Sequence, residues 1–327
     1  WLKPSWLKPL SSGSGLAFSA MGQGSCCLKG LAHLRRRDPP PQDAKTELLR
    51  SMKDRVLNSS FQFEAKIPHA NLSQGAGGAK EETPQAIHTM VPLVLETVEG
   101  DNLEGSIVWD VSIMLARLLM DETKYPDRFF HPQRTFLELG AGCGLPGMVA
   151  ALRGAQVTFT DIASVLPLLH RNVESNLRRL EEKLPQGTAE RLPFAIEGGR
   201  EALVAKLDWT TLQEDLEGFA YTEGAAGERK KAFAPPYNVL LVTDCVYQER
   251  LVKPLVDTMV ALTGPGSLVL LTMRSRFSFQ AAFLQELNVW FSGMPLHPEE
   301  RHLAGLAGSG DIFALRLRRR PAAASTT

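Results

Sequence analysis

From about residue 85 onward, short apolar runs alternate with segments whose apolar positions recur at helical spacing. The runs that predict strands cover 91–98, 135–139, 156–161, 193–196, 238–244, 268–273 and 312–317. Helical spacing predicts helices over 108–120, 146–152, 165–180, 249–262 and 279–290. Such alternation is typical of an α/β fold with a doubly wound, largely parallel sheet and helices on both faces.

The segment 1–84 lacks this periodicity and is rich in Ser, Gly, Pro and Arg stretches. This composition predicts a flexible segment. We therefore expect a single folded domain over 85–320, followed by a short tail at 321–327. Within the domain, the Glu-, Gly- and Ala-rich stretch 210–236 is interpreted as a surface insertion, and no strand can be assigned in the Gly- and Pro-rich stretch 292–311.

Composition excludes several classes of protein. The 36 Lys and Arg residues balance 36 Asp and Glu residues, which argues against binding to nucleic acid or anionic lipid by bulk charge. No apolar stretch approaches the roughly 18–20 residues of a membrane span. The four Cys and the His residues lack the spacing of metal ligands, so we expect no metal site. The cytoplasm is the expected compartment, with the nucleus as an alternative or, through the basic N-terminal segment, an organelle.

The strand at 135–139 leads into a dense glycine turn, Gly140-Ala-Gly-Cys-Gly144, with Gly147 shortly after it. In doubly wound sheets, ligands bind beyond the carboxyl ends of the strands. Glycine lets the backbone turn sharply and approach a ligand closely. The sequence therefore predicts a cofactor site at this turn.

Two cofactors fit the spacing. Residues 142–147 match the GxGxxG pattern of a dinucleotide site, and Asp161 lies 19 residues after Gly142, where such a site needs a carboxylate. Read from Glu138, the turn is instead Glu-x-Gly-x-Gly-x-Gly, and a carboxylate there suits a positively charged ligand such as S-adenosylmethionine. Asp161 can accept both ribose hydroxyls in either case. The turn favours the methyl donor and leaves both ligands open.

Further motifs accompany the turn in chain order: Ile107-Val-Trp-Asp110, Leu137 to Gly147, Val157 to Asp161, Asn172-Val-Glu-Ser-Asn176, Leu207-Asp-Trp209, Thr243-Asp-Cys-Val-Tyr247 and Arg276. This set, over about 87–317, resembles the seven-strand class I methyltransferases, and within them the protein-lysine methyltransferases of the methyltransferase-like 21 group (methyltransferase family 16). The Asp-x-x-Tyr and the early Trp carry most of the specificity. The resemblance implies a Rossmann-like, doubly wound seven-stranded sheet with an N-terminal β extension.

The resemblance also implies S-adenosyl-L-methionine as the cofactor. Gly140, Ala141 and Gly142 would pass under its methionine part, and Asp161 would bind its ribose.

Three further residues complete the cofactor site that the resemblance implies. Trp109 would wall the methionine side, Trp209 would pack near the adenine, and Thr243 would line the pocket. An isolated Trp is more often core material than a cofactor contact, and only the ordered motif set assigns the two Trp residues to the site.

Asp244 ends the predicted strand 238–244 and Tyr247 follows it, so both should open onto the same crevice. A lysine amine attacks a sulfonium methyl only when it is unprotonated. We expect Asp244 to orient the amine and Tyr247 to provide a wall and a hydroxyl, with orientation supplying most of the rate. Arg274 and Arg276 could neutralise an acidic substrate segment or simply be solvated.

The predicted function is therefore an S-adenosylmethionine-dependent protein-lysine N-methyltransferase, a monomer whose partner is a protein substrate. Three alternatives stay open: a methyltransferase for a histidine, an N-terminal amine or a small molecule; a non-catalytic cofactor-binding module; and a dinucleotide oxidoreductase.

Overall fold

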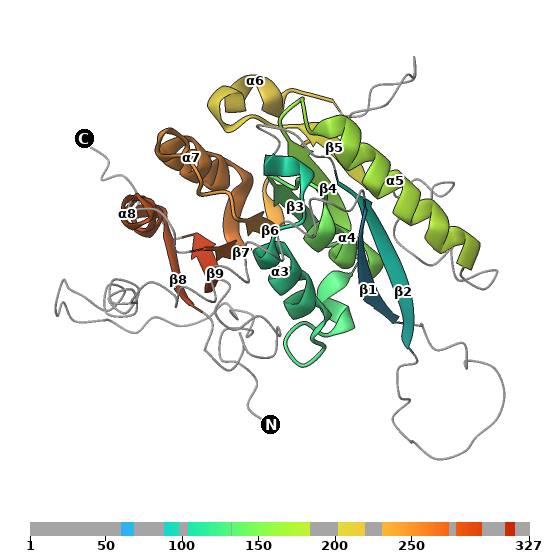
Figure 1. The fold of residues 1–327 in the computed structure, drawn as a ribbon. Coiled ribbons are helices and arrows are strands. Elements are labelled where there is room, and N and C mark those ends of the chain that lie inside the picture. Colours follow the sequence, from blue (N-terminus) through green and yellow to red (C-terminus); the bar gives the residue numbers. More distant parts are fainter. Residues whose placement is uncertain are drawn as a thin grey trace, which may run out of the picture.

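The computed structural model of the chain describes residues 60–68, 88–97, 104–131, 133–183, 202–219, 231–274, 279–295 and 311–317. Seven strands form one sheet in the order β5-β4-β3-β6-β7-β9-β8 (Figure 1). Their bounds are β3 Thr135–Leu139, β4 Gln156–Asp161, β5 Leu203–Lys206, β6 Tyr237–Thr243, β7 Thr263–Met273, β8 Phe291–Pro295 and β9 Asp311–Leu317. Strands β3 to β7 pair in parallel, whereas β9 is antiparallel to both β7 and β8.

This topology confirms the predicted doubly wound, seven-stranded sheet. The strand order reverses at β3, because β4 lies on one side of it and β6 on the other. The crevice of such a sheet opens at the carboxyl ends of the strands beside this reversal. The glycine turn and the segment after β6 both begin there.

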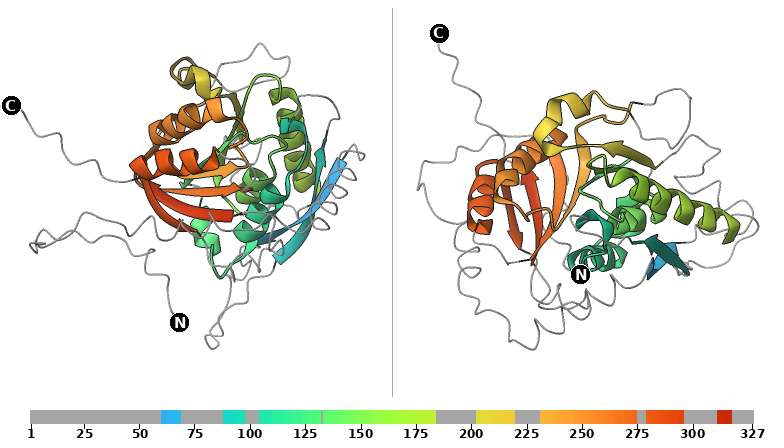
Figure 2. Two further views of the ribbon diagram at one scale, coloured as in Figure 1. Left: turned by 60° about the vertical axis from the view of Figure 1, so that its left-hand side comes forward. Right: turned by 45° about the horizontal axis from the view of Figure 1, so that its top comes forward.

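Helices cover both faces of the sheet (Figures 1 and 2). Their bounds are α3 Asp110–Met120, α4 Leu145–Leu152, α5 Leu166–Lys183, α6 Leu212–Leu216, α7 Val252–Leu262 and α8 Gln280–Trp290. Short 3-10 helices are η3 Glu104–Ser106, η4 Asp127–Phe130, η7 Trp209–Thr211 and η8 Glu249–Leu251.

Alternate side chains of the central strands enter two separate cores. In β6, Val239 and Leu241 pack with α3, α4 and α5, whereas Leu240 and Val242 pack with α7 and α8. Successive side chains of a strand point to opposite faces, so a strand covered on both faces must be apolar throughout. This requirement explains the uninterrupted apolar run of β6.

A two-stranded hairpin lies outside the sheet. It consists of β1 (Ser60–Pro68) and β2 (His88–Glu96), which pair antiparallel. Leu93 and Leu95 of β2 are fully buried in the core shared with α4 and α5, and the hairpin lies beside these helices (Figure 1). It is the predicted N-terminal β extension.

Residues 60–68 form a strand within the segment 1–84, most of which the composition predicts to be flexible. Phe63 and Ala65 are buried, whereas the alternate residues Gln62 and Glu64 are exposed, so β1 is ordered by one apolar face and by its pairing with β2. The remainder of 1–84 lies outside the described residues, as does the tail.

Two strands differ from the predicted series. The run 193–196 lies outside the described residues, and the strand that pairs with the outer edge of β4 is β5 at 203–206. The stretch 292–311, where no strand could be assigned, contains most of β8, which pairs with β9. The predicted insertion 210–236 begins within η7 and contains α6, and Phe219 and Lys231 form a bridge across its undescribed middle.

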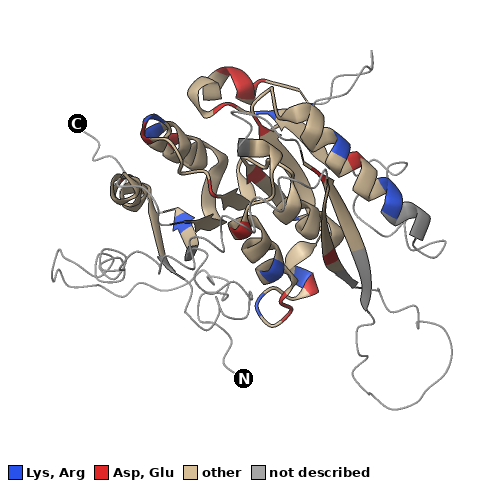
Figure 3. Ribbon diagram, viewed as in Figure 1, with Lys and Arg blue, Asp and Glu red and all other residues tan. Residues whose placement is uncertain are grey.

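Acidic and basic residues are interspersed along α5 and α7 (Figure 3). Glu174 pairs with Arg178 on α5, and Lys253 pairs with Asp257 on α7, at 2.5 Å in both pairs. In the described part of the chain, no helix combines the length and apolarity needed to cross a bilayer.

Candidate functional site

The turn after β3 places three glycines, Gly140, Gly142 and Gly144, at positive φ. Gly140 and Gly142 have φ of +57° and +55°, a region that residues with a Cβ rarely adopt. A Cβ on Gly142 would lie 2.9 Å from the carbonyl oxygen of Gly105, and one on Gly140 would lie 3.0 Å from Cys245 Sγ. The backbone therefore turns in a space that side chains would fill.

A cavity of about 560 Å³ opens at this turn, a volume typical of a cofactor site. The residues predicted to bind the cofactor or the substrate all line it: Trp109, Gly140, Ala141, Gly142, Asp161, Trp209, Thr243, Asp244 and Tyr247. The structure therefore brings together side chains from five separate segments of the chain. Gly105, Ile162 and Arg250 also line the cavity, and sequence reasoning did not identify them.

Asp161 ends β4, and its carboxylate is tied to the turn. Its Oδ2 accepts the N–H of Gly142 at 2.8 Å, and its Oδ1 accepts the N–H of Ile162, also at 2.8 Å. Desolvation raises the pKa of the Asp161 carboxyl to about 6, although both hydrogen bonds act to lower it. A carboxylate oxygen has a second lone pair, so Asp161 can still accept hydroxyl groups of a ligand.

The two Trp residues are half-buried and belong to different walls of the cavity. Trp109 is the N-cap of α3, and the Arg274 guanidinium lies 5.9 Å from its ring centroid. Trp209 begins η7, and its Cζ2 lies 3.3 Å from the position of a Cβ on Gly140. Trp209 is therefore in close contact with the turn.

Asp244 follows β6 in an unusual backbone conformation. Its φ of +53° is unique among the described residues other than glycine. Its N–H donates to the carbonyl of Thr272 at 2.8 Å, which holds it against β7. Such strain persists only where the surroundings impose it, and it is common at active sites. The Asp244 side chain is buried, while Tyr247 is half-exposed at the same cavity.

The motif suggested that the Glu138 carboxylate faces a positively charged ligand, but the structure places it away from the cavity. It is fully buried, does not line the cavity, and accepts the N–H of Gly147 in α4 through Oε2 at 3.0 Å. Burial raises the pKa of this carboxyl to about 8. Glu138 therefore joins the strand to the helix behind the turn, and its charge is not available to a cationic ligand.

The environment of Arg274 also differs from the prediction that this residue neutralises a substrate segment or is solvated. Its guanidinium is buried and pairs with the Asp110 carboxylate at 2.5 Å, so it neither neutralises a substrate segment nor is solvated. Arg276 lies outside the described residues. Asp110 directly follows Trp109, so the motif contained the partner, but nothing in the sequence pattern linked it to Arg274.

The cavity fits S-adenosyl-L-methionine. The open turn leaves room for the methionine part, Asp161 offers an acceptor for the ribose, and Trp209 offers an aromatic face. Among the residues that the structure describes, no group of three or more His, Cys, Asp or Glu side chains could hold a metal ion.

Comparison with known proteins identifies the family. The family described as "Lysine methyltransferase" matches residues 91–189 and 226–290, together half of the chain. The protein N-lysine methyltransferase METTL21A of Danio rerio is 31% identical over 194 residues, which cover 59% of this chain and 71% of the relative. METTL21A of Mus musculus is 30% identical over 59% of this chain and 71% of the relative.

Among solved structures, the 16S rRNA N2 G1207 methyltransferase of T. thermophilus, in complex with AdoMet and guanosine, matches 80% of this chain and 51% of its own. Its TM-score is 0.41 and its sequence identity is 13%. This similarity is too weak to add to the family assignment. The family match itself decides between the two ligands that the glycine spacing left open. The chain therefore belongs to the lysine methyltransferase family, and S-adenosyl-L-methionine is its cofactor.

Proposed function

We propose that this chain transfers a methyl group from S-adenosyl-L-methionine to the side-chain amine of a lysine in a protein substrate. The observation that carries the proposal is the position of Asp244: a buried carboxylate, held at positive φ, that lines the same cavity as the glycine turn. The METTL21A relatives are named protein N-lysine methyltransferases, which supports a lysine in a protein as the acceptor.

The chemistry requires a neutral amine. The bound cofactor supplies a methyl group on a sulfonium sulfur. The lysine Nζ lone pair forms a bond to the methyl carbon as the C–S bond breaks, and the sulfur keeps the bonding electrons. The reference pKa of lysine is about 10.4, so deprotonation near pH 7 costs about 4–5 kcal/mol. Desolvation of the amine in the cavity lowers this cost.

Asp244 and Tyr247 have complementary roles in this proposal. The Asp244 carboxylate accepts a hydrogen bond from the amine and directs its lone pair along the line of attack. The half-exposed Tyr247 ring walls the lysine chain at the mouth of the cavity. The backbone bond from Asp244 to Thr272 fixes the carboxylate before the substrate arrives, and such orientation supplies most of the rate.

The test uses the purified chain, cofactor with a labelled methyl group, and a cell lysate as the source of substrate. Labelled protein is hydrolysed and its methylated amino acids are separated. Methyl-lysine is the expected product. Methyl-histidine or a methylated N-terminal residue would show that the methyl acceptor is another nucleophile and not lysine. Label found only in small molecules would exclude a protein substrate.

Two matched variants test the role of Asp244. Asp244→Asn should lower the labelling rate roughly 100-fold, with little change in the affinity for S-adenosylhomocysteine. Glu249→Gln removes an exposed carboxylate that does not line the cavity, and it should label at the normal rate. Absence of labelling by the unchanged chain, with cofactor binding intact, would instead favour a non-catalytic module.

The cytoplasmic location, the monomeric state and the absence of nucleic-acid binding stay predictions. The zero net charge and the interspersed acidic and basic residues along α5 and α7 in Figure 3 support the last of these.

A further inference from the structure

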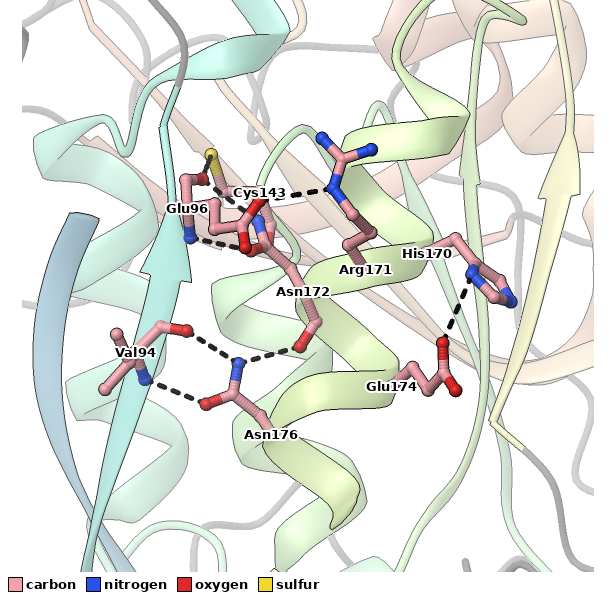
Figure 4. A network of polar contacts seen from close by, with 8 residues as sticks. All are labelled: Val94, Glu96, Cys143, His170, Arg171, Asn172, Glu174 and Asn176. Carbon is pink, nitrogen blue, oxygen red and sulfur yellow. Dashed lines mark hydrogen bonds and ion pairs between the residues drawn. The ribbon is translucent and has the colours of Figure 1, made fainter. Parts of the chain in front are cut away.

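Two Asn side chains of α5 bind the backbone of β2 (Figure 4). The Asn172 amide accepts the N–H of Glu96 at 2.7 Å and donates to its carbonyl at 3.1 Å. The Asn176 amide does the same with Val94, at 2.8 and 2.9 Å. Each amide thus pairs with both backbone groups of one residue, as a residue of a neighbouring strand would.

The bonds of Asn172 and Asn176 to β2 form a ladder, called the Asn ladder below. The spacing of residues along the helix and along the strand makes this ladder possible. Residues four apart on a helix are separated by about 6 Å along its axis, and residues two apart on a strand are separated by about 6.6 Å. Asn172 and Asn176 therefore meet alternate residues of β2, whose opposite edge is paired with β1. Both amides are buried, with 1% of each residue exposed.

Asn172 has one contact that Asn176 lacks. Its Nδ2 also donates to the carbonyl oxygen of Cys143, inside the glycine turn, at 3.3 Å. The Cys143 thiol in turn lies 3.6 Å from the carbonyl of Glu96. The end of β2 and the outer side of the turn therefore meet at one side chain. Asn176 instead donates to the carbonyl of Asn172, within α5.

We infer that Asn172 is a positioning residue for the cofactor, through which the N-terminal hairpin holds the glycine turn in its binding shape. No described residue of the hairpin lines the cavity, so the hairpin acts on the site only through such contacts. A turn at positive φ has other conformations available when it is released, and fixing it in advance reduces the cost of binding. The inference requires only that S-adenosyl-L-methionine binds at the glycine turn, and it does not depend on which group accepts the methyl.

Isothermal titration with S-adenosylhomocysteine separates this role from a purely structural one. Asn172→Ala removes the bonds to both the hairpin and the turn, whereas Asn176→Ala, the matched control, removes bonds to the hairpin and to α5 only. Both should lower the unfolding midpoint. The dissociation constant should rise about tenfold or more in Asn172→Ala and stay within about twofold in Asn176→Ala. Equal effects on affinity would overturn the inference.

Hydrogen exchange of the unchanged chain gives a test that no folding defect can affect. If the hairpin and the cofactor act on the same turn, their coupling is reciprocal. Saturating S-adenosylhomocysteine should slow exchange of the Val94 and Glu96 amides, which donate to the Asn side chains. Unchanged exchange at these two amides, with the turn itself protected, would contradict the coupling.

Discussion

The Arg274 guanidinium reaches from the end of β7 to the Asp110 carboxylate in the first turn of α3, with 8% of the Arg and 4% of the Asp side chain exposed. Residues on both sides of this pair line the cavity. Trp109 precedes Asp110, and the N–H of Arg274 lies 3.5 Å from Asp244 Oδ1. The pair therefore joins the wall proposed for the cofactor to the carboxylate proposed for the substrate.

Loss of this pair should be costly. Arg274→Met leaves the Asp110 carboxylate buried without its cationic partner, and the free energy of unfolding should fall by about 3–5 kcal/mol. Urea unfolding measures the change. The double variant Asp110→Asn with Arg274→Met removes both charges and should lose distinctly less. A double variant as unstable as the single one would show that the charge left behind is not the cause.

Binding of the cofactor should depend on the ionisation of Asp161. With a pKa of about 6, the carboxyl loses its negative charge as the pH falls below that value and becomes a poorer acceptor for ribose hydroxyls. The affinity for S-adenosylhomocysteine should therefore decrease about tenfold between pH 7 and pH 5. Titration calorimetry across this range is the measurement. Asp161→Asn should bind more weakly at pH 7 and show no such dependence.

Glu138 should make the fold less stable at alkaline pH. Burial raises its pKa to about 8 from 4.5, so the folded chain binds this proton more tightly than the unfolded chain does. Its stabilising contribution is present below about pH 4.5 and is lost as the pH rises toward 8. Glu138→Gln mimics the protonated form. In urea unfolding it should match the unchanged chain near pH 5 and exceed its stability by at least about 1 kcal/mol at pH 8.5. Parallel pH profiles would contradict the raised pKa.

The glycine turn should reject a methyl group for two reasons. In Gly142→Ala, the φ of +55° is unfavourable and the new Cβ meets the Gly105 carbonyl at 2.9 Å. Gly266 is a matched control, since its φ is +92° but no atom lies within 4 Å of an added Cβ. Gly266→Ala should lose about 1–2 kcal/mol of stability and still bind S-adenosylhomocysteine. Gly142→Ala should lose detectable binding, and retention of normal affinity would show that the turn tolerates displacement.

The local pattern of apolar residues was sufficient to predict the bounds of strands that are buried on both faces of the sheet. The bounds of β3 and β4 agree with the predicted runs, because a loop or glycine turn flanks each of these short β-branched and apolar segments. It failed for β5, which has four residues, and for β8, which contains Gly and Pro. Both are short strands whose order depends on a neighbour distant in the chain, and β1 likewise depends on β2.

The same limit applies to the site. The sequence identified nine residues that line one cavity, and all but Trp109 lie at or just after the carboxyl ends of parallel strands, which meet at one edge of the sheet. The sequence did not show that the Glu138 side chain points away from the cavity, or that Arg274 pairs with Asp110. Strand alternation held a signal for Glu138, since Phe136 on the same face packs under α4. The Arg274 pair spans 164 positions in the chain, and no local pattern encodes it.

The Asn ladder also bears on how the chain behaves in a crowded solution. A strand edge with free N–H and C=O groups is a template on which another molecule can add a strand, and such edges start aggregation. At Val94 and Glu96, these groups of β2 are already occupied by side-chain amides. A helix thereby closes the edge that a short hairpin would otherwise present to other chains.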